Sequence, residues 1–136
     1  MFKLKKIINS GVNVPEPERC YVSLSKDVKA GTLLLESEGI LGIGNANMTP
    51  THITISDIKK GAGYALCYRI SPEMIFEIET RSYEIAMVSR GCRLSLIDDG
   101  SGFNAISDNI IEEGGALVYD MNGASEYGDT LYVTFK

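Results

Sequence analysis

The sequence predicts a mainly β fold: a compact antiparallel β-sandwich or barrel with an extended N-terminal arm and at most one or two short helices. Two observations predict it. From residue 21 onward, short apolar stretches recur at intervals of about ten residues, the spacing of all-β sandwiches and barrels. Gly, Asp, Asn and Ser separate these stretches, as expected of tight turns. We therefore expect an arm over 1–20 and a single β domain over 21–136.

Each expected strand is a short apolar or alternating run between two turn signals. The segments 51–55 and 131–135 show this most clearly, because alternation there coincides with β-branched and aromatic residues that pack well on a pleated sheet. Asp99-Gly100 lies between two such runs and predicts a hairpin. The expected strands are Tyr21–Leu24, Thr32–Glu36, Ile40–Ile43, His52–Ile55, Tyr64–Ile70, Met74–Thr80, Glu84–Val88, Arg93–Ile97, Asn104–Ile106, Ala116–Asp120 and Thr130–Phe135.

Two segments have helical features as well. A Ser-Pro pair at 71–72 could begin a helix in the segment that follows. The apolar residues there alternate with Glu77 and Glu79, however, which favours a strand over Met74–Thr80. Ile106–Glu113 could hold one helical turn that ends at a glycine.

The first twenty residues differ in composition from the rest. Basic and apolar residues alternate as far as Lys6, and then Pro15 and Pro17 remove backbone donors and hold their neighbours extended. Three interpretations of this arm remain open: a frayed terminus, a strand on the edge of the domain's own sheet, or an extended segment laid on a neighbouring subunit.

Composition and charge argue against several classes of protein. Hydrophobic residues make up 44% of the chain and charged residues 23%, as in ordinary globular domains, which argues against disorder. The formal net charge is −5, so the surface repels phosphate backbones and anionic lipids, and we expect neither nucleic acid nor a membrane as a partner. No apolar run approaches the roughly 20 residues that span a bilayer, and no signal peptide is expected.

No residue pattern predicts catalysis or a bound cofactor. His52 is the only histidine, and a strand histidine with a backbone partner is a simpler interpretation than a Ser-His-Asp triad built around it. Cys20, Cys67 and Cys92 are widely spaced and odd in number, which indicates reduced thiols rather than a disulfide framework. A zinc site would need His52 and these scattered cysteines, with no Cys-x-x-Cys pair to begin it. We therefore predict no catalytic, cofactor-binding or metal site and no enzymatic activity.

Four segments and the arm carry a resemblance to a known family. The segments are the strand at Ala30–Leu35, the long apolar run at 63–78, the Gly-Gly step at Gly114–Val118 and the closing strand at 129–135. In this layout, which covers most of the chain, the sequence resembles the small capsid decoration proteins of tailed bacteriophages. These proteins are also called cement or head-stabilising proteins.

The resemblance implies a non-enzymatic virion protein that binds the outer capsid lattice and stabilises it. It implies the major capsid protein as the partner, a homotrimer as the oligomer, and a place on the capsid exterior after assembly in the host cytoplasm. Lysines of the arm could pair with an acidic capsid surface. The arm residues expected to make contacts are Phe2, Lys3, Leu4, Lys5, Lys6, Ile7, Ile8, Val12 and Val14.

Two other functions remain open. One is a small β-barrel that binds a ligand, or a minor enzyme that uses His52 and nearby carboxylates. The other is a different virion component, such as a tail or head-fibre subunit. A trimer in solution, or binding to empty capsids, would favour decoration, whereas a monomer with a deep apolar pocket would count against it.

Overall fold

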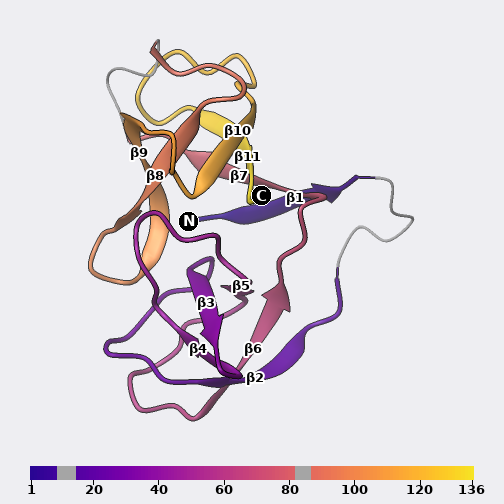
Figure 1. Cartoon of the computed structure of the whole chain (residues 1–136), viewed down its shortest axis with the longest axis vertical. Coiled ribbons are helices and arrows are strands. Elements are labelled where there is room, and N and C mark those ends of the chain that lie inside the picture. Colours follow the sequence, from indigo (N-terminus) through magenta and orange to yellow (C-terminus); the bar gives the residue numbers. More distant parts are fainter. Residues whose placement is uncertain (9–14, 82–86) are drawn as a thin grey trace.

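Figure 1 shows the computed structural model of the chain, which describes residues 1–8, 15–81 and 87–136. These residues form strands and turns, no α-helix occurs among them, and the predicted mainly β class is confirmed. No helix in this part of the chain could cross a bilayer. The strands are β1 (Lys3–Ile7), β2 (Glu18–Val22), β3 (Leu33–Ser37), β4 (Ile40–Gly42), β5 (His52–Thr54), β6 (Tyr64–Arg69), β7 (Met74–Glu79), β8 (Arg93–Asp98), β9 (Phe103–Ile110), β10 (Ala116–Asp120) and β11 (Thr130–Thr134).

Strands β2 to β6 close into a small barrel, which lies in the lower half of Figure 1. Their order is β3-β4-β2-β6-β5, and pairing between β3 and β5 joins the two ends. Neighbouring strands are antiparallel except for β2 and β4, which run parallel. The barrel encloses a small apolar core made of Val22, Leu24, Val28, Leu34, Leu41, Ile58 and Cys67.

The remaining strands, β1 and β7 to β11, form what we call the second unit. Their order is β1-β7-β11-β10-β8-β9, and a parallel bridge between Thr80 and Ile106 brings β9 back towards the end of β7. One pairing, Leu33 with Phe103, joins β9 to the barrel. The second unit holds the larger core, to which barrel residues also contribute: Phe2, Leu33, Met48, Ile53, Met74, Phe76, Ile78, Val88, Leu94, Leu96, Ile106, Ala116, Val118, Leu131, Val133 and Phe135.

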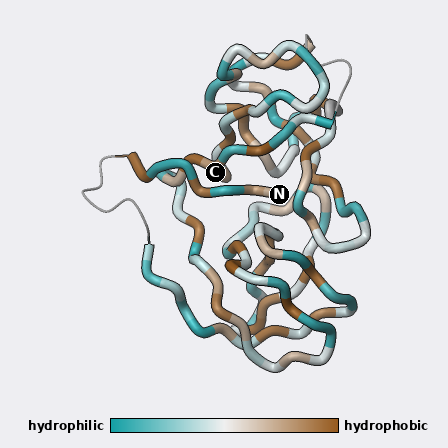
Figure 2. Tube along the Cα trace, turned by 180° about the vertical axis from the view of Figure 1, so that it is seen from behind, coloured by the Kyte–Doolittle hydropathy of each residue, from teal (hydrophilic) through white to brown (hydrophobic). Residues whose placement is uncertain are grey.

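Hydropathy along the trace follows this division into strands and connections. Hydrophobic segments concentrate on the strands of both units, and several connecting loops are hydrophilic (Figure 2). The strands therefore bury their apolar side chains on two cores, while the loops keep their polar groups in water.

A turn of the form Val/Ile-x-x-Gly precedes four of the strands. The positive φ of Gly31, Gly61 and Gly91 (76°, 90° and 90°) is a conformation that glycine adopts without steric cost. Val28 and Ile58 bridge two of these turns through reciprocal backbone hydrogen bonds of 2.9 Å. This repeat was not predicted from the sequence. The four turns and the strands that they precede are 28–31 before β3, 58–61 before β6, 88–91 before β8 and 111–114 before β10.

The strand predictions agree closely with the structure. Every expected strand within the described residues overlaps an observed one, and Met74–Thr80 is a strand rather than a helix. The strand expected at Glu84–Val88 falls mainly outside the described residues. The helical turn expected within Ile106–Glu113 is wrong, because β9 continues to Ile110 and pairs there with Leu94 of β8.

Residues 1–20 are not one separate arm. Residues 3–7 form β1, an edge strand that pairs antiparallel with β7 of the same chain, and residues 18–20 begin β2 of the barrel. Phe2 is 2% exposed and meets the ring of Phe135 edge-on at 5.4 Å. Burial of this ring holds the N-terminus against the second unit. Of the three interpretations left open, the described residues show a strand on the edge of the domain's own sheet.

Candidate functional site

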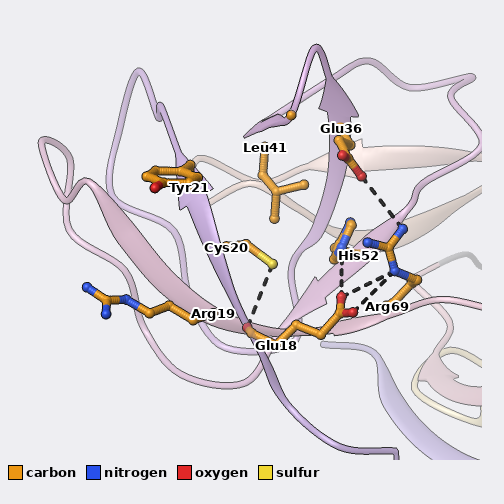
Figure 3. Close-up of a pocket in the computed structure, with 9 residues that line it drawn as sticks. Glu18, Arg19, Cys20, Tyr21, Glu36, Leu41, His52 and Arg69 are labelled. Atoms are coloured by element: carbon orange, nitrogen blue, oxygen red, sulfur yellow. Dashed lines mark hydrogen bonds and ion pairs between the residues drawn. The ribbon is translucent and has the colours of Figure 1, made fainter.

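Five polar side chains meet at one end of the barrel, which we call the barrel mouth. Side chains alternate between the two faces of a strand, so those in register with the apolar barrel core point inward. Glu18 lies opposite Cys67, and His52 lies opposite both Leu34 and Arg69. A cavity of about 400 Å³ opens here (Figure 3). The five side chains are Glu18 and Cys20 of β2, Glu36 of β3, His52 of β5 and Arg69 of β6.

The guanidinium group of Arg69 forms ion pairs with two carboxylates at the barrel mouth. Arg69 Nε lies 3.2 Å from Glu18 Oε2, and Arg69 Nη1 lies 3.7 Å from Glu36 Oε2. All three side chains are partly open to solvent, so each ion pair contributes less than about 1 kcal/mol to stability. Two negative charges and one positive charge leave the cluster with a net negative charge.

His52 is 1% exposed, and a hydroxyl group fixes the orientation of its ring. Its Nδ1 lies 2.9 Å from Thr51 Oγ1, which also accepts a hydrogen bond from the Glu36 amide at 2.8 Å and donates to the Leu34 carbonyl at 3.5 Å. The hydroxyl can accept a hydrogen bond from Nδ1 or donate its own proton to Nδ1, and either arrangement holds the ring in place. The sequence analysis expected a backbone partner for this histidine, and the structure instead shows a side-chain hydroxyl.

Nε2 of His52 faces a carboxylate oxygen of Glu18. Nε2 is buried without a hydrogen-bond partner and lies 3.5 Å from Glu18 Oε2. Burial, and secondarily the charge of Arg69, lowers the pKa of His52, while the two glutamates raise it. The ring is therefore neutral at pH 7, and this contact is not an ion pair.

Two thiols lie beside the histidine on the inner face of the barrel. Burial and the charge of Glu18 raise the pKa of Cys20, and burial raises the pKa of Cys67 to about 12. Both thiols are therefore protonated at neutral pH. Ligand atoms of Glu18, Cys20 and His52 all lie within 4.8 Å of one another. His52 and the cysteines were considered as zinc ligands from the sequence, but Glu18 was missed. Its signal was the spacing to Cys20, because residues two apart on a strand share one face.

The outer wall of the barrel carries an apolar surface, which we call the wall patch. Tyr21 pairs in register with Tyr64 on one side and with Ile40 on the other, and Arg19 pairs with Leu66. The two tyrosine rings are 4.8 Å apart, and the guanidinium of Arg19 lies 4.2 Å above the ring of Tyr64. Tyr21 is 60% exposed and Leu66 is 52% exposed. Exposed apolar side chains that adjoin one another in this way are typical of binding surfaces.

The predicted arm residues occupy different environments. Phe2 was expected to contact another chain, and this is corrected because the ring is buried in the chain's own core. The lysine side chains are exposed on β1, where Lys5 Nζ lies 5.9 Å from the ring centre of Tyr132 and Lys6 Nζ lies 6.0 Å from that of Tyr119. Val12 and Val14 lie outside the described residues. The half-buried arm residues are Leu4, Ile7 and Ile8, of which the first two pack against the larger core.

One comparison with known proteins gives a match. No protein-family model and no curated protein matches the chain. Among solved structures, the fold is similar to that of the N-terminal base of the head fibre protein gp8.5 of bacteriophage phi29, with a TM-score of 0.50 and 14% sequence identity. The match covers 89% of this chain and 95% of the phage chain. At this identity, the likeness establishes a shared fold.

Proposed function

We propose that the chain is a non-enzymatic structural protein of a phage virion that binds the outer surface of the head. The observation that carries the proposal is the fold shared with the base of a phage head fibre over nearly the full length of both chains. The layout of the sequence, which resembles capsid decoration proteins, points independently to the same class. If the chain has either role, its task is to bind the folded proteins of the head, and a preformed surface suits that task.

The wall patch is the surface that would bind the head. Tyrosine and arginine are enriched at the energetic centres of protein interfaces, and tyrosine buries a large area with only two side-chain torsions. The stacking of Arg19, Tyr64 and Tyr21 holds these side chains in place before binding, which lowers the entropy lost on association. Many copies on one lattice would add avidity to a modest affinity for each site.

The oligomer that we propose is a homotrimer bound to the major capsid protein. Among the described strands, β1 lies at the end of the strand order and pairs with β7 alone. Its other edge is therefore open to a strand of a neighbouring copy. Lys3 and Lys5 are exposed on this strand, and edge lysines disfavour indiscriminate strand pairing while permitting a matched acidic neighbour. Sedimentation equilibrium would test this part, because a monomer at micromolar concentration would contradict it.

Cosedimentation with heads tests the proposed function directly. Empty heads assembled from the major head protein encoded in the same genome would be incubated with the chain and pelleted. We expect the wild-type chain to pellet with the heads, and Tyr21→Ala to weaken binding at least tenfold, as at an interface hot spot. Tyr127→Ala is the matched control, because Tyr127 is 52% exposed and lies in the second unit.

Each outcome bears on a different part of the proposal. A wild-type chain that stays in the supernatant at all concentrations would contradict head binding. Equal binding by Tyr21→Ala and the wild type would instead remove the wall patch from the interface. Circular dichroism of both variants would verify that neither substitution of an exposed tyrosine unfolds the chain.

A further inference from the structure

The barrel mouth contains a buried polar atom that the proposed virion function does not explain. His52 Nε2 has no hydrogen-bond partner and points at a carboxylate oxygen 3.5 Å away. A buried polar atom that is left without a hydrogen bond lowers the stability of the folded chain. A bound ion or water that fills the gap is one explanation of such an atom in a native structure.

Three donor atoms of different kinds surround this gap. They are a carboxylate oxygen of Glu18, the sulfur of Cys20 and Nε2 of His52, all within 4.8 Å of one another. Two ligand atoms of a tetrahedral zinc ion, at bond lengths of 2.0–2.3 Å, lie roughly 3.5 Å apart. The separation between Glu18 Oε2 and His52 Nε2 already has this value. We propose that the barrel mouth binds one Zn²⁺ ion through Glu18, Cys20 and His52, with the fourth position open to the cavity.

The ligand with the least freedom is already oriented for this task. The hydrogen bond between Nδ1 and Thr51 Oγ1 fixes the orientation of the ring, as the outer partners of metal-binding histidines commonly do. Glu18 and Cys20 lie on one face of β2, and Glu18 is 43% exposed, so a small rotation of its side chain closes the remaining distance. A bound ion would therefore connect β2 to β5 across the barrel mouth.

Arg69 is compatible with the ion. Its Nε lies 3.2 Å from Glu18 Oε2 and 3.5 Å from Oε1, so one carboxylate oxygen can bind metal while the other keeps its hydrogen bond to the guanidinium. The second carboxylate, Glu36, lies 3.7 Å from Arg69 Nη1 and leaves the mouth with a net negative charge before the ion arrives. That charge attracts a cation and offsets the nearby guanidinium.

The ligand set selects the class of metal. Magnesium and calcium bind six or more oxygen atoms, whereas a sulfur, a nitrogen and a single oxygen suit zinc or its substitute cobalt. Three protein ligands with one open position are also typical of zinc sites that admit water or another small ligand. The cavity of about 400 Å³ provides room for that fourth ligand.

Absorption spectroscopy with Co²⁺ tests the site, because a bond between the metal and the sulfur of Cys20 gives its own absorption band. The full chain, freed of metal with a chelator, would be titrated with Co²⁺, and we expect one equivalent to produce visible bands of a tetrahedral ion together with a near-ultraviolet thiolate-to-cobalt band. Zn²⁺ should then displace Co²⁺ and raise the thermal midpoint. This readout is independent of any binding to phage heads, so the site and the proposed function can fail separately.

Matched variants identify the ligands. Cys20→Ser should abolish the thiolate band, His52→Gln and Glu18→Gln should weaken cobalt binding at least tenfold, and Cys92→Ser should leave the spectrum unchanged because Cys92 belongs to the second unit. Circular dichroism would confirm that the variants fold. A wild-type chain without the band, a band that survives in Cys20→Ser, or a band lost in Cys92→Ser would overturn the proposal.

Discussion

The barrel and the second unit each contain two strands that follow a Val/Ile-x-x-Gly turn, but they bury different side chains. In the second unit the core contains large apolar groups, among them Phe76, Leu131 and Val133. The barrel core is smaller, and it includes the thiol of Cys67 and borders the buried ring of His52. Both units nearly or fully close a ring of strands, so closure alone does not determine what fills the interior.

Because of this difference, we expect the second unit to supply stability and the barrel to carry the groups that bind other molecules. The burial of apolar area is the main favourable term in folding, so the second unit should hold most of the stability. The barrel can then accommodate a polar mouth on its inner side and an exposed apolar patch on its outer wall, each of which lowers stability locally. Proteins commonly place binding groups on such regions while a rigid neighbouring core holds them in position.

The largest effect is expected from truncation in the second unit. Phe76 is fully buried, and its ring lies 5.3 Å from that of Phe135. Phe76→Ala should lower the free energy of unfolding by about 3–5 kcal/mol, because the lost apolar contacts leave a cavity. Urea denaturation measures this loss. Leu34→Ala, in the barrel core, should cost less, and a larger cost for Leu34 would reverse the assignment of stability to the two units.

The next largest effect is expected at the N-terminus and tests whether its residues are part of the core of the second unit. Phe2→Ala should lower the free energy of unfolding by about 3 kcal/mol, since the ring is 2% exposed and packs against Phe135. A neighbouring substitution, Lys3→Ala, should change it by less than about 0.5 kcal/mol, because the side chain is exposed. If thermal melting showed no difference between the two variants, the first residues would act as a free arm rather than as part of the core.

Local patterns predicted the elements of both units because strands and turns depend on neighbouring residues. Alternation identified β5 and β11, and the Asp99-Gly100 turn identified the β8–β9 hairpin. For the arm, local patterns left three interpretations open. The alternation of Lys3, Leu4 and Lys5 fits an edge strand on this domain as well as one on another chain, and only the pairing with β7 decides between them.

Long-range pairing explains why the barrel mouth was not predicted. Glu18 and His52 lie far apart in the sequence and meet only because β2, β6 and β5 are neighbours in the barrel. Nothing local specifies that order or the parallel pairing of β2 with β4. A usable signal was present in the spacing of Glu18 and Cys20, since residues two apart on a strand share a face. The Val/Ile-x-x-Gly repeat was equally visible, but its glycines were considered one turn at a time.

A smaller effect is expected from alanine substitutions at equivalent glycines of the repeated turn. Gly31 and Gly61 both have positive φ, so an alanine at either position is strained by about 1 kcal/mol. A methyl group on Gly31 would also lie 2.8 Å from the Phe2 carbonyl oxygen, whereas one on Gly61 would meet nothing within 4 Å. Gly31→Ala should therefore lower the thermal midpoint more than Gly61→Ala. Equal midpoints would indicate that β1 moves away from the barrel at little cost.

The smallest effect concerns the β8–β9 hairpin, which joins the two units. Burial disfavours the charged form of Asp99, but hydrogen bonds from Ser101 and the charge of Arg81 outweigh it and hold its pKa at about 2. The Ser101 carbonyl in turn accepts hydrogen bonds from Lys29 and Thr32, next to the barrel.

Because the pKa of Asp99 in the folded state lies below its ordinary value of 3.8, its contribution to stability is present above pH 4 and is lost as the pH falls to about 2. In urea melts at pH 5, 3 and 2, the wild type should therefore lose more stability than Asp99→Asn. The difference should be less than about 1 kcal/mol, since the carboxylate is partly open to solvent. A wild type and an Asp99→Asn variant that lose stability in parallel would mean that the charge of Asp99 does not strengthen the joint. Any loss of stability at low pH would then come from other ionisable groups of the barrel or the second unit.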